Sequence, residues 1–265
     1  MRIGFFDSGI GGITVLHQAL RFLPNEDYIF YADTLHVPYG EKPKEEVREY
    51  IFNAVDFMAN QGIKALVIAC NTATSIAVDD LRKKYDFPIL GIEPAVKPAV
   101  ENCEGKRKKV LVLATSLTLK EEKFHNLVKR IDRHDIVESL PLPGLVEFAE
   151  NFEFKEEKVV PYLKEKLSSF DLKQFGTVVL GCTHFPYFEN SIKKIFPKDV
   201  DIISGSIGTA KNLKRVLETN NQMNDGTGDI KFFKSGYEVE DKETLSAYNE
   251  LLVLLDRMSS ITTLV

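Results

Sequence analysis

The chain has 265 residues, of which 44% are hydrophobic and 28% charged, and its formal net charge is −5. This length suffices for one large domain or two small ones with their own cores. The negative net charge predicts no broad basic face for nucleic acid, and the longest apolar runs are far shorter than the roughly 20 residues of a membrane span. Three cysteines without a pairing pattern, in a chain that begins directly on a strand with no room for a signal peptide, predict a cytoplasmic protein.

Strand-like and helix-like segments alternate along the chain, which is typical of a mostly parallel sheet covered by helices. Short apolar runs predict strands at residues 2–6, 28–31, 64–69, 88–92, 109–114, 135–140, 177–181 and 200–203. Amphipathic spacing predicts helices at residues 13–22, 45–61, 118–130 and 155–168, and a helix in the tail at 245–255 that packs on the first domain.

Two of the predicted strands end in the same way, at a cysteine followed by small polar residues. Residues 66–73 are Leu-Val-Ile-Ala-Cys-Asn-Thr-Ala, and residues 178–185 are Val-Val-Leu-Gly-Cys-Thr-His-Phe. In an α/β sheet such strand ends open onto the crevice where ligands bind. We therefore predict an α/β fold of two pseudo-symmetric domains, each a mostly parallel sheet flanked by helices, with the active site in the cleft between them. The first domain is predicted to comprise residues 1–94 and 206–265, and the second residues 95–205.

A glycine-rich loop follows the first predicted strand, with the sequence Asp7-Ser8-Gly9-Ile10-Gly11-Gly12. The dinucleotide-binding pattern G-x-G-x-x-G requires glycine at position 14, which is Thr14, and Asp7 would repel a pyrophosphate. The better interpretation is a tight turn that exposes Asp7 and Ser8, with free backbone amides near a helix N-terminus. A glycine-rich turn with an exposed aspartate and no further role is the competing interpretation.

The two cysteines carry the strongest chemical signal. Cys70 is expected at the N-terminus of a helix, where the helix dipole and free amides favour a thiolate, and Asn71 and Thr72 could cap that helix. Cys182 is predicted to have the same geometry, with His184 two residues later. The remaining cysteine, Cys103, lies in a polar segment and is interpreted as structural.

A metal site and a hydrolase site are the alternatives at Cys182. The metal site would need ligands beyond Cys182 and His184, and the other histidines lack metal-binding spacing. These are His17, His36, His125 and His134. A Cys–His nucleophile pair lacks an orienting asparagine and gives no role to Cys70. We predict no metal.

Five loops that follow strands, at residues 7–12, 33–40, 70–74, 115–118 and 182–185, are expected to line one crevice. Together they offer two thiols, two carboxylates, several hydroxyls, an amide and an imidazole, but no cluster of Arg or Lys. This set suits a small zwitterion such as an amino acid. Two thiols on opposite faces of its α-carbon could remove one proton and deliver another, while Asp7 and His184 tune the thiols.

Four motifs occur here in a fixed order: Phe-Asp-Ser-Gly-x-Gly-Gly, Pro-Tyr-Gly, Ala-Cys-Asn-Thr-Ala and Gly-Cys-Thr-His-x-Pro. Together they closely resemble the bacterial glutamate racemases of the aspartate/glutamate racemase family. The resemblance implies a cofactor-independent enzyme that interconverts L- and D-glutamate for peptidoglycan synthesis. Its partners would be the small-molecule substrate glutamate and a second copy of the chain, because members are commonly homodimers.

The resemblance also implies roles for individual residues. Cys70 would act on the α-proton of D-glutamate and Cys182 on that of L-glutamate. The other implied catalytic residues are Asp7, His184, Asp33 and Glu150. The implied substrate-binding residues are Asp7, Ser8, Pro38, Tyr39, Gly40, Asn71, Thr72, Thr115, Thr118, Thr183 and His184. The chain departs from the family pattern at Glu121, Phe124 and Tyr187, where Ser, Tyr and Leu are common.

Two competing functions remain open from the sequence. The first is racemisation of another acidic amino acid, chiefly aspartate. An assay of both substrates distinguishes it from glutamate racemisation. A thiol-based binding or redox-sensing protein would form a Cys70–Cys182 disulfide on mild oxidation and exchange no α-proton with solvent. Sulfur atoms that flank an α-carbon would lie too far apart for a bond of about 2 Å.

Overall fold

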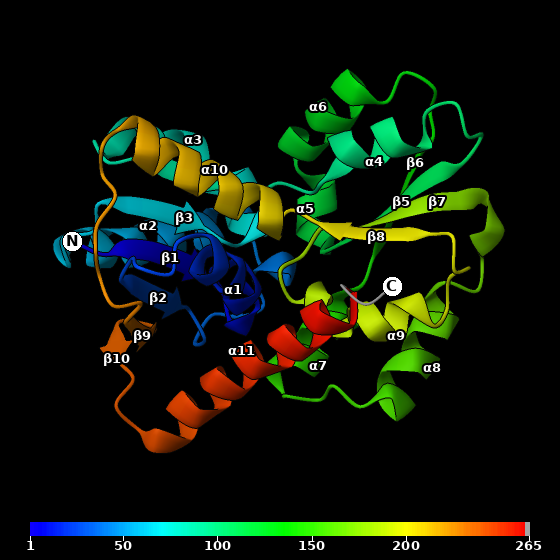
Figure 1. The fold of residues 1–265 in the computed structure, drawn as a ribbon. Helices are drawn as coiled ribbons and strands as arrows, with labels where there is room; N and C mark the ends of the chain where they lie inside the picture. The colour runs from blue at the N-terminus through cyan, green and yellow to red at the C-terminus, as the bar shows by residue number, and fades with distance from the viewer. Residues whose placement is uncertain (263–265) are drawn as a thin grey trace.

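The computed structural model describes residues 1–262 and contains two β-sheets whose faces are covered by helices (Figure 1). The six-stranded sheet has the order β10-β9-β2-β1-β3-β4, and the four-stranded sheet has the order β6-β5-β7-β8. Every neighbouring pair is parallel except β9 and β10. The predicted α/β fold class is therefore confirmed.

The six-stranded sheet is built from both ends of the chain. Its strands are β1 (Ile3–Asp7), β2 (Tyr28–Ala32), β3 (Ala65–Ile68), β4 (Ile89–Gly91), β9 (Ile230–Lys234) and β10 (Tyr237–Glu238). The helices and 3-10 turns around it are η1 (Ile10–Gly12), α1 (Ile13–Phe22), η2 (Tyr39–Glu41), α2 (Lys44–Asn60), α3 (Asn71–Lys84), α10 (Ser206–Thr219) and α11 (Lys242–Thr262). Every residue of β1, β2 and β3 is buried, because helices cover both faces of these central strands.

The four-stranded sheet comes from the middle of the chain. Its strands are β5 (Lys109–Ala114), β6 (Val137–Pro141), β7 (Phe175–Leu180) and β8 (Asp201–Ser204). Its helices and 3-10 turns are α4 (Val96–Cys103), α5 (Ser116–Lys120), α6 (Glu122–Ile131), α7 (Pro143–Glu150), α8 (Glu156–Lys166), η3 (Leu172–Gln174), η4 (Phe185–Phe188) and α9 (Glu189–Lys193). The chain therefore crosses between the sheets twice, after β4 and after β8.

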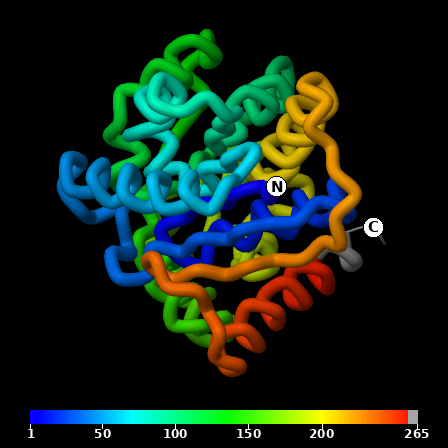
Figure 2. The backbone as a smooth tube through the Cα atoms, turned by 90° about the vertical axis from the view of Figure 1, so that its left-hand side faces the viewer, coloured from blue at the N-terminus to red at the C-terminus, as the bar shows by residue number. Residues whose placement is uncertain are grey.

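The tail returns to the first sheet, as the sequence predicted. Helix α10 packs beside α1, and α11 contacts α1 as well. In α11 the ring of Tyr248 lies 6.3 Å from Phe30 of β2 and 5.1 Å from Phe232 of β9. Figure 2 shows the orange segment that contains β9 beside β2, with the red helix α11 below.

The sequence analysis missed two strands and made two wrong predictions of local structure. Strands β9 and β10 were not predicted, because β9 is a short apolar pair with a lysine on each side that pairs with distant β2, and the two-residue β10 pairs only with β9. The helix expected at 118–130 is interrupted at Glu121, whose extended backbone separates α5 from α6. Cys182 is followed by a turn and the 3-10 segment η4, so it does not begin an α-helix as Cys70 does.

The loops after β1, β2, β3, β5 and β7 meet between the two sheets, which places their polar residues around one cavity. None of the described helices is both long and apolar enough to cross a membrane.

Candidate active site

A small cavity lies between the two sheets, at the ends of the strands. It offers about 20 Å³ in which a water-sized molecule can be centred, roughly the space of one water. Its walls are Ser8, Pro38, Tyr39, Gly40, Cys70, Asn71, Thr72, Thr115, Thr118, Val146, Gly181, Cys182, Thr183 and His184. The structure thus brings together both thiols and most residues that the sequence singled out. Three further predicted residues do not line the cavity but contact residues that do: Asp7, Asp33 and Glu150.

Cys70 follows β3 and is itself the N-cap of α3, a place that the sequence analysis gave to Asn71 or Thr72. Its sulfur accepts the Ala73 N–H at 3.4 Å and lies 3.8 Å from Ser8 Oγ. Burial and the nearby Asp7 carboxyl nevertheless raise the pKa of the Cys70 thiol to about 12. The helix N-terminus acts in the expected direction, because the hydrogen bond from the Ala73 N–H lowers the pKa of the Cys70 thiol, but burial outweighs it.

Asp7 is fully buried beneath Cys70, so the loop does not expose it as the sequence suggested. The carboxylate accepts the Gly9 N–H at 2.8 Å and the Thr183 hydroxyl at 2.9 Å, and Ser8 Oγ lies 3.5 Å away. Burial raises the pKa of Asp7 to about 6, although the His184 charge and these hydrogen bonds oppose the rise. A carboxyl that titrates near neutral pH can exchange a proton with Cys70 through Ser8.

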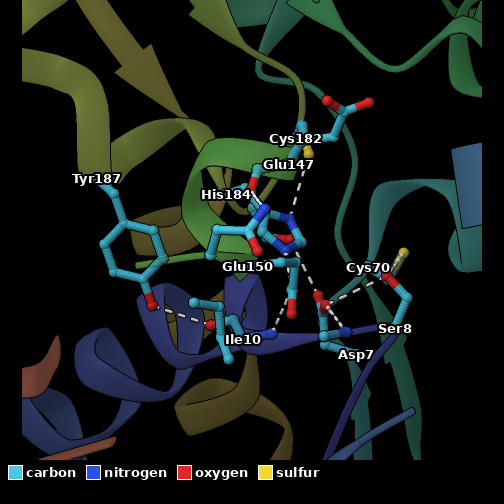
Figure 3. Close-up of polar contacts among 12 residues, drawn as sticks. Asp7, Ser8, Ile10, Cys70, Glu147, Glu150, Cys182, His184 and Tyr187 are labelled. Carbon is cyan, nitrogen blue, oxygen red and sulfur yellow. Dashed lines mark hydrogen bonds and ion pairs between the residues drawn. The ribbon is translucent and has the colours of Figure 1, made fainter. Parts of the chain in front are cut away.

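Cys182 follows β7 and has an imidazole in place of a carboxyl beside it. His184 Nδ1 lies 3.6 Å from the Cys182 sulfur, and His184 Nε2 lies 2.6 Å from Glu150 Oε1 (Figure 3). Burial lowers the pKa of His184, but hydrogen bonds with Cys182 and Glu150 outweigh it and raise the pKa well above its usual value. An imidazolium held between a thiol and a carboxylate can carry protons to and from Cys182.

The glycine-rich loop packs directly against these two side chains. A Cβ on Gly9 would overlap the Glu150 carboxylate, and one on Gly11 would overlap the His184 ring. The Ile10 N–H donates to Glu150 Oε1 at 2.8 Å. The glycines therefore serve close packing against His184 and Glu150, which gives a physical reason for the loop without a nucleotide.

Hydroxyls from both sheets meet on another wall of the cavity. Thr72 Oγ1 lies 3.0 Å from both Thr115 Oγ1 and Thr118 Oγ1, which joins α3 to α5. Asn71 Oδ1 is buried and has no hydrogen-bond partner among the residues that the structure describes. Because an unpaired buried carbonyl is costly, Asn71 is suited to accept a hydrogen bond from a ligand.

Asp33 acts on the cavity through Tyr39. The Tyr39 hydroxyl donates to Asp33 Oδ2 at 2.5 Å, and Ser235 Oγ donates to Asp33 Oδ1 at 2.9 Å. Burial and the Asp33 charge raise the pKa of Tyr39 far above its usual value, so the phenol stays protonated. Asp33 thus fixes the Tyr39 ring that lines the cavity.

Sequence analysis missed Val146, Gly181 and Ser235. Val146 is an apolar wall residue on α7, Gly181 is a linker between β7 and Cys182, and Ser235 belongs to the unpredicted turn after β9. Gly181 opens the Gly-Cys-Thr-His-x-Pro motif, which could have identified it, whereas Val146 and Ser235 lie outside the four motifs. Among the described residues, no group of three or more His, Cys, Asp or Glu side chains is arranged to hold a metal ion. Cys103 is buried at the end of α4, where its thiol contacts Thr177 outside the cavity.

Comparison with known proteins gives one consistent family. The family model for Asp/Glu/Hydantoin racemase matches residues 14–210. Glutamate racemase 2 of Bacillus subtilis (strain 168) is 67% identical over 256 residues, 97% of each chain. The structure of Escherichia coli glutamate racemase in complex with L-glutamate and the activator UDP-MurNAc-ala is 31% identical, with a TM-score of 0.75 and 82% of each chain covered. Glutamate racemase from Francisella tularensis in complex with D-glutamate is 29% identical, with a TM-score of 0.79, covering 95% of this chain and 92% of that one.

Proposed function

The chain belongs to the Asp/Glu/hydantoin racemase family and is an amino-acid racemase, and from this premise we propose that it interconverts L- and D-glutamate through two thiols, without a cofactor. The observation that carries the proposal is the pair of buried cysteines, one from each sheet, on one cavity. Each has its own proton-exchanging partner, and the relatives solved with L-glutamate and D-glutamate support the substrate.

In the proposed reaction from L to D, the Cys182 thiolate takes the α-proton of L-glutamate and becomes a thiol. The Cys70 thiol then gives its proton to the opposite face of the carbanion and becomes a thiolate. To restore the starting state, Asp7 gives a proton to Cys70 through Ser8 and takes one up from solvent, while the His184 imidazolium releases its proton to solvent and then accepts the proton of Cys182. The reverse direction exchanges the roles of the two thiols, so no proton is gained or lost overall.

Substrate binding supplies the rest of the proposed site. Asn71 Oδ1 accepts a hydrogen bond from the substrate ammonium group, and the hydroxyls of Thr72, Thr115 and Thr118 donate to a carboxylate. Tyr39, Gly40 and the remaining wall residues enclose the side chain. This assignment is consistent with the hydroxyl-rich composition of the wall and with the absence of Arg and Lys from it.

The cavity has room for the centre of about one water molecule, so we propose that two domains move apart to admit an amino acid. The domains are residues 1–94 with 206–265, and residues 95–205. By resemblance to its family, the enzyme would supply D-glutamate for peptidoglycan synthesis and act as a homodimer, two points that remain predictions.

The test is proton NMR of the purified protein with L-glutamate in D₂O and no added cofactor, together with circular dichroism of the amino acid. We expect the α-proton signal to disappear and the optical signal to decay to zero. Parallel samples contain D-glutamate and both aspartate enantiomers. Exchange of aspartate alone would move the assignment to aspartate racemisation, and no exchange of any of the four would overturn the proposed function.

A further inference from the structure

Tyr187 is a buried polar side chain to which the proposed mechanism gives no role. It lies in η4, three residues after His184, and only 5% of it is exposed. It does not line the cavity. Its hydroxyl donates to the Ile10 carbonyl at 2.9 Å, and its ring packs 5.4 Å from that of Phe154.

The Ile10 residue connects Tyr187 to the acid–base groups. Its carbonyl accepts the Tyr187 hydroxyl, while its N–H donates to Glu150 Oε1 at 2.8 Å (Figure 3). The same Glu150 oxygen lies 2.6 Å from His184 Nε2, and His184 Nδ1 lies 3.6 Å from the Cys182 sulfur. A continuous series of contacts therefore runs from the phenol to the thiol.

The geometry of the loop makes this connection stiff. Gly9 and Gly11, on either side of Ile10, pack so closely against Glu150 and His184 that a Cβ on either would overlap them. A rotation of the Ile10 peptide groups would therefore push on both side chains. The Tyr187 hydroxyl opposes that rotation, because without it the buried Ile10 carbonyl would lose this partner.

We infer that Tyr187 is a positioning residue for Cys182, which holds the glycine-rich loop in the orientation that aligns Glu150 and His184 with the thiol. The inference rests on the proposed function. The phenol is suited to this role because burial and the nearby Asp7 and Glu150 charges raise its pKa well above the usual value, so it remains a donor. Its effect falls mainly on the Cys182 half of the reaction, because the series above ends at Cys182, whereas the loop reaches the Cys70 side only through the Gly9 N–H that donates to Asp7 at 2.8 Å.

The test compares the parent protein with Tyr187→Phe, which keeps the ring and its packing. Tyr28→Phe is the matched control, because the Tyr28 hydroxyl is also buried and donates to a backbone carbonyl, that of Leu23 at 2.6 Å, outside the site. Each protein is assayed with glutamate that carries hydrogen or deuterium at Cα, in both enantiomers. Thermal unfolding of each variant checks that it is folded.

The enantiomers have equal free energy in water, so kcat/KM must be the same in both directions for every variant. Primary isotope effects reveal which proton transfer limits the rate. For Tyr187→Phe we expect kcat/KM to fall about tenfold, because misaligned catalytic groups slow the chemical step. We expect the isotope effect to rise with L-glutamate, whose α-proton goes to Cys182, and to fall with D-glutamate. Tyr28→Phe should match the parent in all these values.

A double-mutant cycle then tests the route through Glu150. If Tyr187 acts through that carboxylate, Tyr187→Phe should cost less than about threefold when it is introduced into Glu150→Gln. An unchanged kcat/KM in Tyr187→Phe, equal changes of both isotope effects, or additive losses in the cycle would each overturn the inference. A parent protein that does not racemise glutamate would instead overturn the proposed function.

Discussion

The Cys70 and Cys182 sides of the cavity differ in the groups that surround equivalent thiols. Each cysteine ends a buried central strand of its sheet, and each is almost completely buried. Cys70 caps a helix and has a serine and a carboxyl of raised pKa beside it. Cys182 precedes a turn and has an imidazole of raised pKa backed by a carboxylate. One position in the fold thus supports two different acid–base arrangements.

The comparison also shows how each side depends on the opposite sheet. Asp7, the last residue of β1 in the first sheet, accepts a hydrogen bond from the hydroxyl of Thr183, which follows β7 of the second sheet. Glu150, from the second sheet, accepts the N–H of Ile10 from the first. The carboxyls near the two thiols therefore keep these hydrogen bonds only while the sheets lie together. Separation of the sheets would release both at once, which would couple substrate exchange to the loss of acid–base alignment.

The largest expected effect comes from removal of either thiol. Cys70→Ala and Cys182→Ala should each reduce glutamate racemisation by about 10³-fold or more, because each removes one of the two groups that transfer the proton. Cys103→Ala is the matched control, since that thiol is also buried but lies outside the cavity. Circular dichroism of glutamate measures all three. Racemisation at the parent rate by either of the first two variants would end the two-thiol mechanism.

Serine in place of each cysteine should separate the two halves of the reaction. We expect racemisation to fall roughly 100-fold, because near neutral pH a hydroxyl is a poorer base and a poorer acid than a thiol. Proton removal from D-glutamate should suffer most in Cys70→Ser, and removal from L-glutamate in Cys182→Ser. The primary deuterium isotope effect should therefore rise with D-glutamate in the first variant and with L-glutamate in the second. The same pattern in both variants would argue against one thiol per enantiomer.

Asp7 makes the stability of the folded protein depend on pH. Its pKa rises from 3.8 to about 6 on folding, so the folded state favours the protonated carboxyl. The stability from this group is fully present below pH 4 and is lost as pH rises through about 6, a change of about 3 kcal/mol. Asp7→Asn removes this dependence.

The free energy of unfolding of Asp7→Asn, measured in urea at pH 4 and pH 8, should rise relative to the parent by about 3 kcal/mol between the two. Asp27→Asn is the contrasting control, because hydrogen bonds from Thr227 lower the pKa of Asp27 and its pH dependence has the opposite sign. A difference that stays constant from pH 4 to pH 8 would mean that Asp7 has an ordinary pKa in the folded protein.

The smallest expected effect concerns the carboxylate behind His184. Glu150→Gln should reduce kcat/KM about tenfold and lower the pKa of His184, because it removes one of the hydrogen bonds that raise it. Proton NMR of the His184 ring measures that pKa directly. Glu147→Gln, an exposed residue one turn earlier on α7, should leave both quantities unchanged. An unchanged pKa of His184 in Glu150→Gln would contradict a role of Glu150 in the acid–base chemistry of Cys182.

The central strands and their polar ends were predictable because they depend on local patterns. Buried apolar runs such as 64–69 and 177–181 predict strands from composition alone. The cysteine after each run marks the edge of the sheet at which the cavity lies. The five loops that the sequence grouped do meet at one cavity. Strands β9 and β10 were not predictable in this way, because β9 forms against β2, which lies about 200 residues earlier in the chain, and β10 forms against β9.

The sequence by itself determined which chemical groups stand at the strand ends, since side-chain identity and strand periodicity are local properties. Only the tertiary structure decided their electrostatics and alignment. Burial outweighs the amide hydrogen bond at Cys70 and raises the pKa of its thiol, and it makes Asp7, which was expected to be exposed, a buried carboxyl whose pKa is raised to about 6. The contact of Ile10 with Glu150 joins residues 140 positions apart. Desolvation and such contacts depend on the complete packed fold, and no short segment of sequence contains them.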